Sequence, residues 1–275
     1  MKKKNKWNGE NLSILSLGGG VQSSALYLAA AQGEMLFHKY DMPDLAIFAD
    51  TQAEPQSTYD TIDELEKLYG DRIPIDRVTA GNLEEVKPDF ASIPFFRPGP
   101  KGRQMMPRQC TSQFKVEPII QHIRKLVGAG PRQHVKEKVV QWIGISWDEA
   151  IRAKNSPLKW LETVWPLLEK RWTRGHCLEY LQKQCNENLV FFDEIVKRSA
   201  CVFCPFKSDT EWEELQKNPL EWDRAVAYDE KLRNLEGGEN YLHSSCKPLK
   251  DVRLDTFRDQ MLLNFNNECH GMCGN

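Results

Sequence analysis

Two cysteines three positions apart are the most chemically specific feature of this sequence. They frame the run Cys201-Val202-Phe203-Cys204-Pro205. Thiolates at this spacing can bind one metal ion or one cluster, and a cysteine followed by proline recurs in iron–sulfur ligation. The pair therefore predicts metal or cluster chemistry. Two alternatives stay open, a pair of buried structural cysteines and a structural zinc ion.

A second sulfur-bearing segment lies near the C-terminus and reads Glu268-Cys269-His270-Gly271-Met272-Cys273. An adjacent histidine can lower the pKa of a thiol and so favour the nucleophilic thiolate. We therefore predict Cys269 as a catalytic nucleophile and Cys273 as a thiol that can resolve its product into a disulfide. A tail without catalytic function and an additional metal ligand are the alternatives.

Three consecutive glycines, Gly18, Gly19 and Gly20, follow an apolar run and precede Ser23 and Ser24. Glycine lets the backbone turn tightly and approach a ligand, and the serines add hydroxyls at the positive end of the next helix. This turn predicts an anion site for phosphate or sulfate. It matches neither the Walker A pattern nor Gly-x-Gly-x-x-Gly. The alternative is a tight turn that uses glycine for geometry alone.

The elements that must position these residues alternate between strand and helix in the first half of the chain. The apolar patterns predict strands at 11–17, 45–49, 73–78 and 139–145, and helices at 23–31 and 59–68. In the second helix, Ile62, Leu65 and Leu68 share one face. The order predicts a doubly wound α/β fold with a mostly parallel sheet in residues 1–155. Such sheets bind ligands at their carboxyl edge.

The remaining segments are less regular. Residues 92–107 hold four prolines and three basic residues, which predicts a loop over a site. From about Trp160 onward the strand pattern fades. Residues 156–275 are therefore predicted as a smaller, mostly helical portion that carries cysteines and covers the edge of the sheet.

Composition limits where the protein works and what it binds. The chain of 275 residues has 37 Lys and Arg against 39 Asp and Glu, a net charge of −2. This balance gives no general support for nucleic-acid binding. No apolar run approaches the length of about 18 residues that a membrane span needs, and no secretory signal is recognised. Eight cysteines in a chain that can fold without disulfides predict metal or redox chemistry in a reducing cytoplasm.

The glycine loop resembles the PP-loop of the adenine nucleotide α-hydrolase superfamily, Ser-Gly-Gly-x-Asp-Ser-Ser/Thr, with Gly18 for the first serine and Gln22 for the aspartate. A neutral amide is a poor ligand for Mg²⁺, which disfavours cleavage of ATP at its α-phosphate. Phosphoadenylyl-sulfate (PAPS) reductases are similar in accepting glutamine there. The resemblance implies an adenosine nucleotide, either PAPS, adenylyl sulfate (APS) or ATP. Its predicted ligands in the loop are Gly18, Gly19, Gly20, Gln22, Ser23 and Ser24.

Three later blocks resemble the same family. Residues 47–55, with Asp50 and Thr51, are similar to its Asp-Thr-Gly block beside the nucleotide. Residues 108–119 resemble the Cys-Cys-x-x-x-Lys-x-x-Pro-Leu block of PAPS and APS reductases, with Thr111 in place of the second cysteine. Residues 144–152 resemble Gly-Ile-Arg-x-x-Glu-Ser-x-x-Arg. Guanidinium and ammonium groups suit phosphate and sulfate oxygens. The candidates are Lys101, Arg103, Arg108, Lys115, Arg152, Arg171 and Arg174, and we favour Lys115, Arg152 and Arg174.

In the cluster-bearing reductases of this family, a late Cys-x-x-Cys joins the cysteines of the earlier block. The resemblance implies a [4Fe-4S] cluster held by Cys110, Cys201 and Cys204, with zinc as the alternative. A four-thiolate site needs one more ligand. We predict Cys177 because it shortly precedes Cys201 and has basic neighbours. The next candidates are Cys185 and Cys246.

The C-terminal segment resembles the Glu-Cys-Gly-x-His motif of these reductases, whose cysteine attacks the sulfur of the substrate. The sequence is therefore identified as a PAPS reductase-like oxidoreductase with a thioredoxin-like electron donor. One alternative keeps the fold but makes the protein an adenylating ATP pyrophosphatase that thiolates or phosphorothioates a nucleic acid. Another is a nucleotide-binding, non-catalytic partner of a larger assembly.

Overall fold

The computed structural model describes residues 11–34, 42–85, 93–100, 102–184, 199–233, 235 and 238–254. Its centre is a five-stranded sheet in the order β3-β2-β1-β6-β7, and each neighbouring pair of strands is parallel. The strands are β1 (Leu12–Leu17), β2 (Leu45–Ala49), β3 (Ile75–Val78), β6 (Val139–Ile143) and β7 (Leu161–Val164). The predicted doubly wound, mostly parallel α/β sheet is confirmed.

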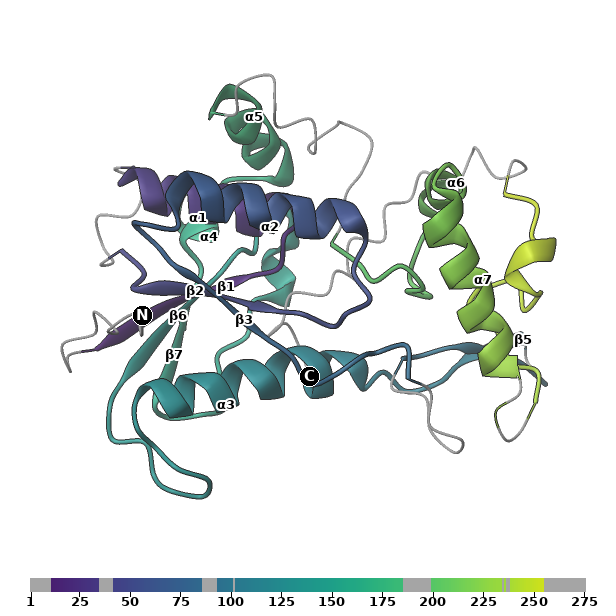
Figure 1. The fold of residues 1–275 in the computed structure, drawn as a ribbon, viewed down its shortest axis with the longest axis horizontal. Coiled ribbons are helices and arrows are strands. Elements are labelled where there is room, and N and C mark those ends of the chain that lie inside the picture. The colour runs from purple at the N-terminus through teal and green to yellow at the C-terminus, as the bar shows by residue number, and fades with distance from the viewer. Residues whose placement is uncertain are drawn as a thin grey trace.

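Helices cover both faces of this sheet (Figure 1). One face is covered by α1 (Val21–Gln32), α2 (Gln56–Tyr69), α4 (Pro166–Glu169) and α5 (Arg174–Gln184), and the other by α3 (Glu117–Leu126). In β1, Leu15 and Leu17 belong to the core under α1, whereas Leu12 and Ile14 belong to the core under α3. All six residues of β1 are buried, as expected for a strand with a helical layer on each side.

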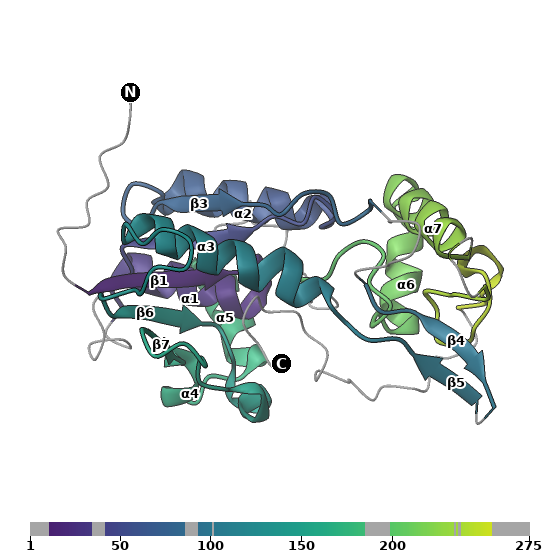
Figure 2. The same cartoon turned by 90° about the horizontal axis from the view of Figure 1, so that it is seen from below.

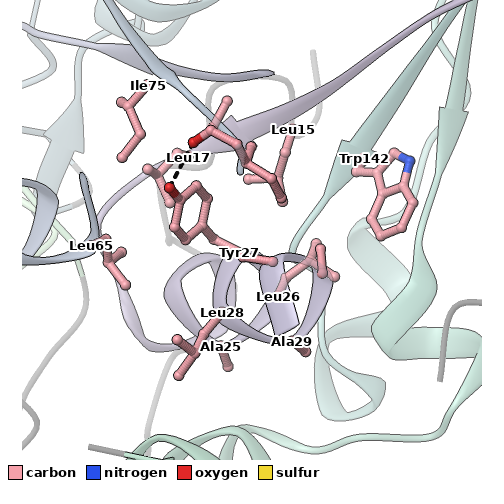
Figure 3. Close-up of a cluster of buried hydrophobic side chains, with 14 of the residues drawn as sticks. Leu15, Leu17, Ala25, Leu26, Tyr27, Leu28, Ala29, Leu65, Ile75 and Trp142 are labelled. Carbon is pink, nitrogen blue, oxygen red and sulfur yellow. Dashed lines mark hydrogen bonds between the residues drawn. The ribbon is translucent and has the colours of Figure 1, made fainter. Parts of the chain in front are cut away.

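Tyr27 shows how a polar atom is satisfied in the core under α1 (Figure 3). It lies in one cluster with Leu17, Leu65 and Ile75. Its hydroxyl donates a hydrogen bond of 2.7 Å to the carbonyl of Ile73. Burial raises the pKa of this phenol above its usual value, so the group is neutral. The bond ties α1 to the segment that enters β3.

The helices predicted at 23–31 and 59–68 are confirmed as α1 and α2. Gly33 ends α1 with a φ of 70°, a left-handed conformation that glycine adopts without strain. In α2 the predicted apolar face is confirmed for Ile62 and Leu65, which are buried. The prediction is wrong for Leu68, which is 44% exposed, because the buried face of α2 continues from Leu65 to Tyr69, which packs against the core in its place.

Residues 92–107 do not form the predicted loop but contain an antiparallel hairpin of β4 (Phe96–Gly99) and β5 (Gly102–Met105). Phe96 also exchanges backbone hydrogen bonds of 2.8 and 2.9 Å with Tyr241. A strand at the edge of a sheet leaves part of its backbone unpaired, so Pro98 is tolerated in β4. The hairpin thereby joins the C-terminal part of the chain.

The C-terminal part is built on α6 (Asp209–Gln216) and α7 (Pro219–Arg233), and Figure 2 shows both beside the β4–β5 hairpin. Its core contains Trp212 and the stacked rings of Phe203 and Tyr228, whose centroids are 3.9 Å apart. The predicted helical C-terminal part is thus confirmed. However, β7 pairs with β6, so the sheet continues past residue 155. Within the described ranges, no helix has the length and apolar character needed to cross a membrane.

Candidate functional site

The glycine loop lies at the carboxyl end of β1, beside the place where the strand order reverses between β1 and β6. Open α/β sheets bind ligands at this position. Gly19 has a φ of 72°, which favours glycine, and Gly20 is the N-cap of α1. The Ser23 hydroxyl donates to the Gly20 carbonyl at 3.1 Å and accepts from the Gly18 amide at 3.2 Å. The first turn of α1 therefore offers amide donors to an anion.

Neighbouring segments pack tightly against this loop. A Cβ atom on Gly144, after β6, would lie 2.9 Å from the backbone nitrogen of Ser23, and one on Gly20 would lie 3.2 Å from Cβ of Ser199. Ser199 also donates its hydroxyl to the Gly18 carbonyl. The segment that leads into Cys201 therefore lies directly on the glycine loop.

Asp50 and Thr51 follow β2 at the same edge of the sheet. Oδ1 of Asp50 accepts hydrogen bonds of 2.8 Å from the Tyr59 hydroxyl and from the backbone amide of Gln52. Burial and the bond to Asp50 raise the pKa of Tyr59 above its usual value. Thr51 is buried and donates its hydroxyl to Glu54 at 3.1 Å. Two hydrogen bonds thus hold the Asp50 carboxylate at the edge of the sheet. The Thr51 hydroxyl is instead bonded to Glu54.

Glu54 is a further site residue, and one of its carboxylate oxygens contacts three side chains. Its Oε1 lies 2.9 Å from Nζ of Lys115, 3.1 Å from Oγ1 of Thr51 and 3.6 Å from Sγ of Cys201. The side chains of Glu54 and Lys115 are 0% and 6% exposed. The predicted anion ligand Lys115 is therefore paired with a buried carboxylate next to Cys201.

A second polar network lies beside the glycine loop. Nη1 of Arg174 donates to Oε1 of Gln22 at 3.1 Å, and Nε2 of Gln22 donates to Oε2 of Glu149 at 3.4 Å. Arg152 pairs with the same oxygen of Glu149 at 2.9 Å. The structure thus brings the predicted ligands Gln22, Arg152 and Arg174 together. Glu149 is a further site residue, and its signal in the sequence was the glutamate of the Gly-Ile-Arg-x-x-Glu block.

The other basic candidates cover aromatic rings. The guanidinium groups of Arg103, Arg108 and Arg171 lie 5.7, 5.4 and 5.5 Å from the ring centroids of Phe96, Phe206 and Trp147. Lys101 lies outside the described residues.

Some of the predicted metal ligands come together. Cys110 and Cys201 both pack against the core of the C-terminal part. Burial, with both cysteines close by, raises the pKa of Tyr228 above its usual value. Cys204 follows in a turn in which its amide donates to the Cys201 carbonyl at 3.0 Å. Cys110, Cys201 and Tyr228 therefore lie close together at this core.

Cys177 does not join this group. It is fully buried on α5, in the core under α1. Burial raises the pKa of its thiol to about 12, whereas metal ligation needs a thiolate. Across the described ranges, no group of three or more His, Cys, Asp or Glu residues can hold a metal ion. The described residues thus do not assemble the predicted four-thiolate site. Cys185, Cys269 and Cys273 lie outside them.

The family of this chain follows from comparison with known proteins. No curated protein sequence matches it. The crystal structure of a PAPS reductase from Candida auris in a phosphate complex is similar at 13% identity and a TM-score of 0.41, covering 69% of this chain and 80% of that chain. The family model of the phosphoadenosine phosphosulfate reductase domain matches residues 13–207. This range holds the glycine loop, both polar networks and Cys201-x-x-Cys204. The chain belongs to the phosphoadenosine phosphosulfate reductase domain family.

Proposed function

We propose that this protein is an enzyme of the PAPS/APS reductase type, which binds an adenylyl sulfate at the glycine loop and reduces its sulfur. The hydrogen bond from Ser199 to the Gly18 carbonyl is the observation that carries this proposal. It brings the segment of Cys201 against a loop suited to phosphate or sulfate. A loop that offers backbone amides and a segment that carries cysteines therefore share one edge of the sheet, which supports the reduction of an activated sulfate as the reaction.

Nucleotide binding is assigned to three groups at this edge. The amides in the first turn of α1 would hold phosphate or sulfate oxygens, and Arg174 would add a guanidinium. Asp50, oriented by the Tyr59 hydroxyl at 2.8 Å, would accept a hydrogen bond from the nucleoside. The family membership and the doubly wound fold support this assignment.

Cys269 is the proposed nucleophile. Its thiolate would attack the sulfur of the substrate, the bond from sulfur to the phosphate oxygen would break, and the nucleotide would leave with that oxygen. The resulting S-sulfonate would release sulfite when a thiol of a thioredoxin-like dithiol attacks the cysteine sulfur. The second thiol of the donor then frees Cys269 and leaves the donor as a disulfide.

A [4Fe-4S] cluster is the proposed metal group, with zinc as the alternative. The spacing of Cys201 and Cys204 and the position of Cys110 beside the same core support it. Anaerobic purification followed by iron, sulfide and zinc analysis tests this. Cys110→Ser and Cys201→Ser are expected to lose the metal, while Cys177→Ser retains it. Stoichiometric zinc without iron would contradict the cluster.

The reaction is tested with PAPS, APS and ATP on one preparation. Sulfite release from PAPS or APS with a reduced thioredoxin is the expected result, and Cys269→Ser should abolish it with the metal content unchanged. Cys177→Ser, in the core under α1, serves as the control and should retain turnover. Pyrophosphate release from ATP would instead favour an adenylating sulfurtransferase. Nucleotide binding without either product would favour a non-catalytic partner.

A further inference from the structure

The β4–β5 hairpin lies in a basic stretch of a nearly neutral chain. Residues 90–114 hold four basic residues and no Asp or Glu, although the whole chain has a net charge of −2. The strands β4 and β5 form a two-stranded sheet of their own, and all four residues of β5 are exposed. Figure 2 shows the hairpin beside the C-terminal helices. A local excess of positive charge attracts anions even where the net charge is near zero.

Each of two arginines in the hairpin contacts neutral groups. Nε of Arg97 donates to Oδ1 of Asn240 at 2.5 Å. Nη1 of Arg103 donates to the carbonyl of Ser244 at 3.4 Å, and its guanidinium lies 5.7 Å from the ring centroid of Phe96. In the part of the chain that the structure describes, no carboxylate pairs with Arg103. These contacts hold the Arg103 side chain in place without neutralising its charge.

Two lysines near the hairpin also keep their charge. Lys247 is exposed, and Nζ of Lys207 lies 5.9 Å from the ring centroid of Trp212. Across the described ranges, neither lysine forms an ion pair with a carboxylate. Lys250 differs from them, because its Nζ lies 3.0 Å from a carboxylate oxygen of Glu230.

One short segment joins these cations. It begins at His243, whose Nε2 lies 3.1 Å from Oδ1 of Asp209 in the first turn of α6. Lys207 lies two positions before Asp209. The segment contacts Arg103 through a backbone carbonyl at 3.4 Å and ends at Lys247. Arg103, Lys207 and Lys247 therefore lie on neighbouring segments, and we call them the basic surface.

A single-stranded nucleic acid fits the basic surface better than other polyanions do. Its phosphates repeat along a flexible backbone, so they can reach cations that lie on separate segments. Its bases can stack on a guanidinium plane, and Arg103 presents one beside the ring of Phe96. An acidic peptide supplies charge but no bases, and a duplex keeps its bases stacked inside.

We propose that the basic surface binds a single-stranded nucleic acid through its phosphates, a function separate from nucleotide binding at the glycine loop. The hairpin leads directly towards Cys110. The guanidinium of Arg108 lies 5.4 Å from the ring centroid of Phe206, which is two positions after Cys204. A strand on the basic surface would therefore lie close to the sulfur-bearing segment.

Fluorescence anisotropy of the full chain with labelled oligouridylate and oligothymidylate tests this proposal. Each phosphate contact with a single strand contributes about 0.7 to the slope of log affinity against log salt. Three contacts should therefore lower the affinity about twentyfold between about 50 and 200 mM salt. Binding of either probe with this salt dependence supports the proposal, and tighter binding of oligouridylate would identify the strand as RNA.

Substitutions of two exposed residues locate the binding. Arg103→Gln and Lys247→Gln should each weaken binding and reduce the salt slope by about 0.7. Lys250→Gln is the matched control, because Lys250 is already paired with Glu230, and it should bind as the wild type does. Thermal unfolding identifies a variant that fails to fold, and the other variant then decides.

Four results would overturn the proposal. The first is that neither oligonucleotide binds at the lower salt concentration, and the second is wild-type affinity in both Arg103→Gln and Lys247→Gln. Polyglutamate that binds as tightly as the oligonucleotides would identify an acidic protein as the partner instead. Displacement of the strand by excess APS would place it at the glycine loop, which contradicts a separate surface and leaves the proposed function standing.

Discussion

Lys115 and Glu54 form a buried ion pair that links the helix following Cys110 to the loop after β2. Nζ and Oε1 are 2.9 Å apart, and the two side chains are 6% and 0% exposed. The same oxygen lies within 3.6 Å of Sγ of Cys201. One carboxylate therefore connects the nucleotide edge of the sheet with the sulfur-bearing segment.

Breaking this pair should be costly because a single buried charge remains. Lys115→Met and Glu54→Gln are each expected to lower the free energy of unfolding, with Lys115→Met losing about 3–5 kcal/mol. The double variant should lose less than the sum of the two. Lys67→Met is the control, because Lys67 is 75% exposed in its pair with Glu64, and it should change stability by no more than about 1 kcal/mol. Urea unfolding measures all four, and equal losses in Lys115→Met and Lys67→Met would contradict the prediction.

Replacing Gly144 by any other residue is expected to destabilise the protein, because a Cβ atom there would lie 2.9 Å from both Cα and the nitrogen of Ser23. Gly144→Ala should lose about 1–3 kcal/mol of stability and weaken nucleotide binding, since the first turn of α1 must move. Gly175→Ala is the matched control. Its nearest contact would be Oγ1 of Thr173 at 3.6 Å, so alanine in this helical position should gain about 0.5–1 kcal/mol. Chemical denaturation distinguishes the two, and a stable Gly144→Ala with unchanged binding would refute the close packing.

The sheet could be predicted because its central strands are continuous apolar runs, such as Leu45–Ala49, whose residues are all buried. The β4–β5 hairpin could not be predicted, since all four residues of β5 are exposed and carry no alternating apolar pattern. Its strands form through pairing with each other and with Tyr241, a contact distant in sequence. The strand β7 is equally short, and its pairing with β6 decides its conformation.

The glycine loop could be predicted because its groups are consecutive in the chain. The bond between Gln22 and Arg174 spans 152 positions, so no local pattern carries it. The basic neighbours of Cys177 predict a thiolate ligand, yet its helical spacing from Leu181 places both residues on the buried face of α5. Helical periodicity predicts the environment of Cys177 better than its basic neighbours do, because a residue on the apolar face of a helix points into the core.

The buried thiol of Cys177 should make stability depend on alkaline pH. Burial raises its pKa to about 12, against about 8.5 in an unfolded chain. Above pH 8.5 the unfolded chain releases this proton first, so the folded state loses stability as the pH rises towards 12. Between pH 8 and pH 10 the wild type should lose about 2 kcal/mol more than Cys177→Ala. Urea unfolding at both pH values checks this, and identical pH dependence in the two proteins would show that the thiol is accessible to solvent.

Two tyrosine hydroxyls allow the contribution of Asp50 to be isolated. Tyr59 donates to Asp50 at 2.8 Å at the edge of the sheet, whereas Tyr27 donates to the Ile73 carbonyl at 2.7 Å in the core. Tyr59→Phe and Tyr27→Phe each remove one hydrogen bond, which should cost about 1–3 kcal/mol of stability. Only Tyr59→Phe should also weaken nucleotide binding, because Asp50 loses the bond that orients its carboxylate. Calorimetry and urea unfolding on both variants separate the two effects. Equal nucleotide affinities in the two variants would place Asp50 outside the binding site.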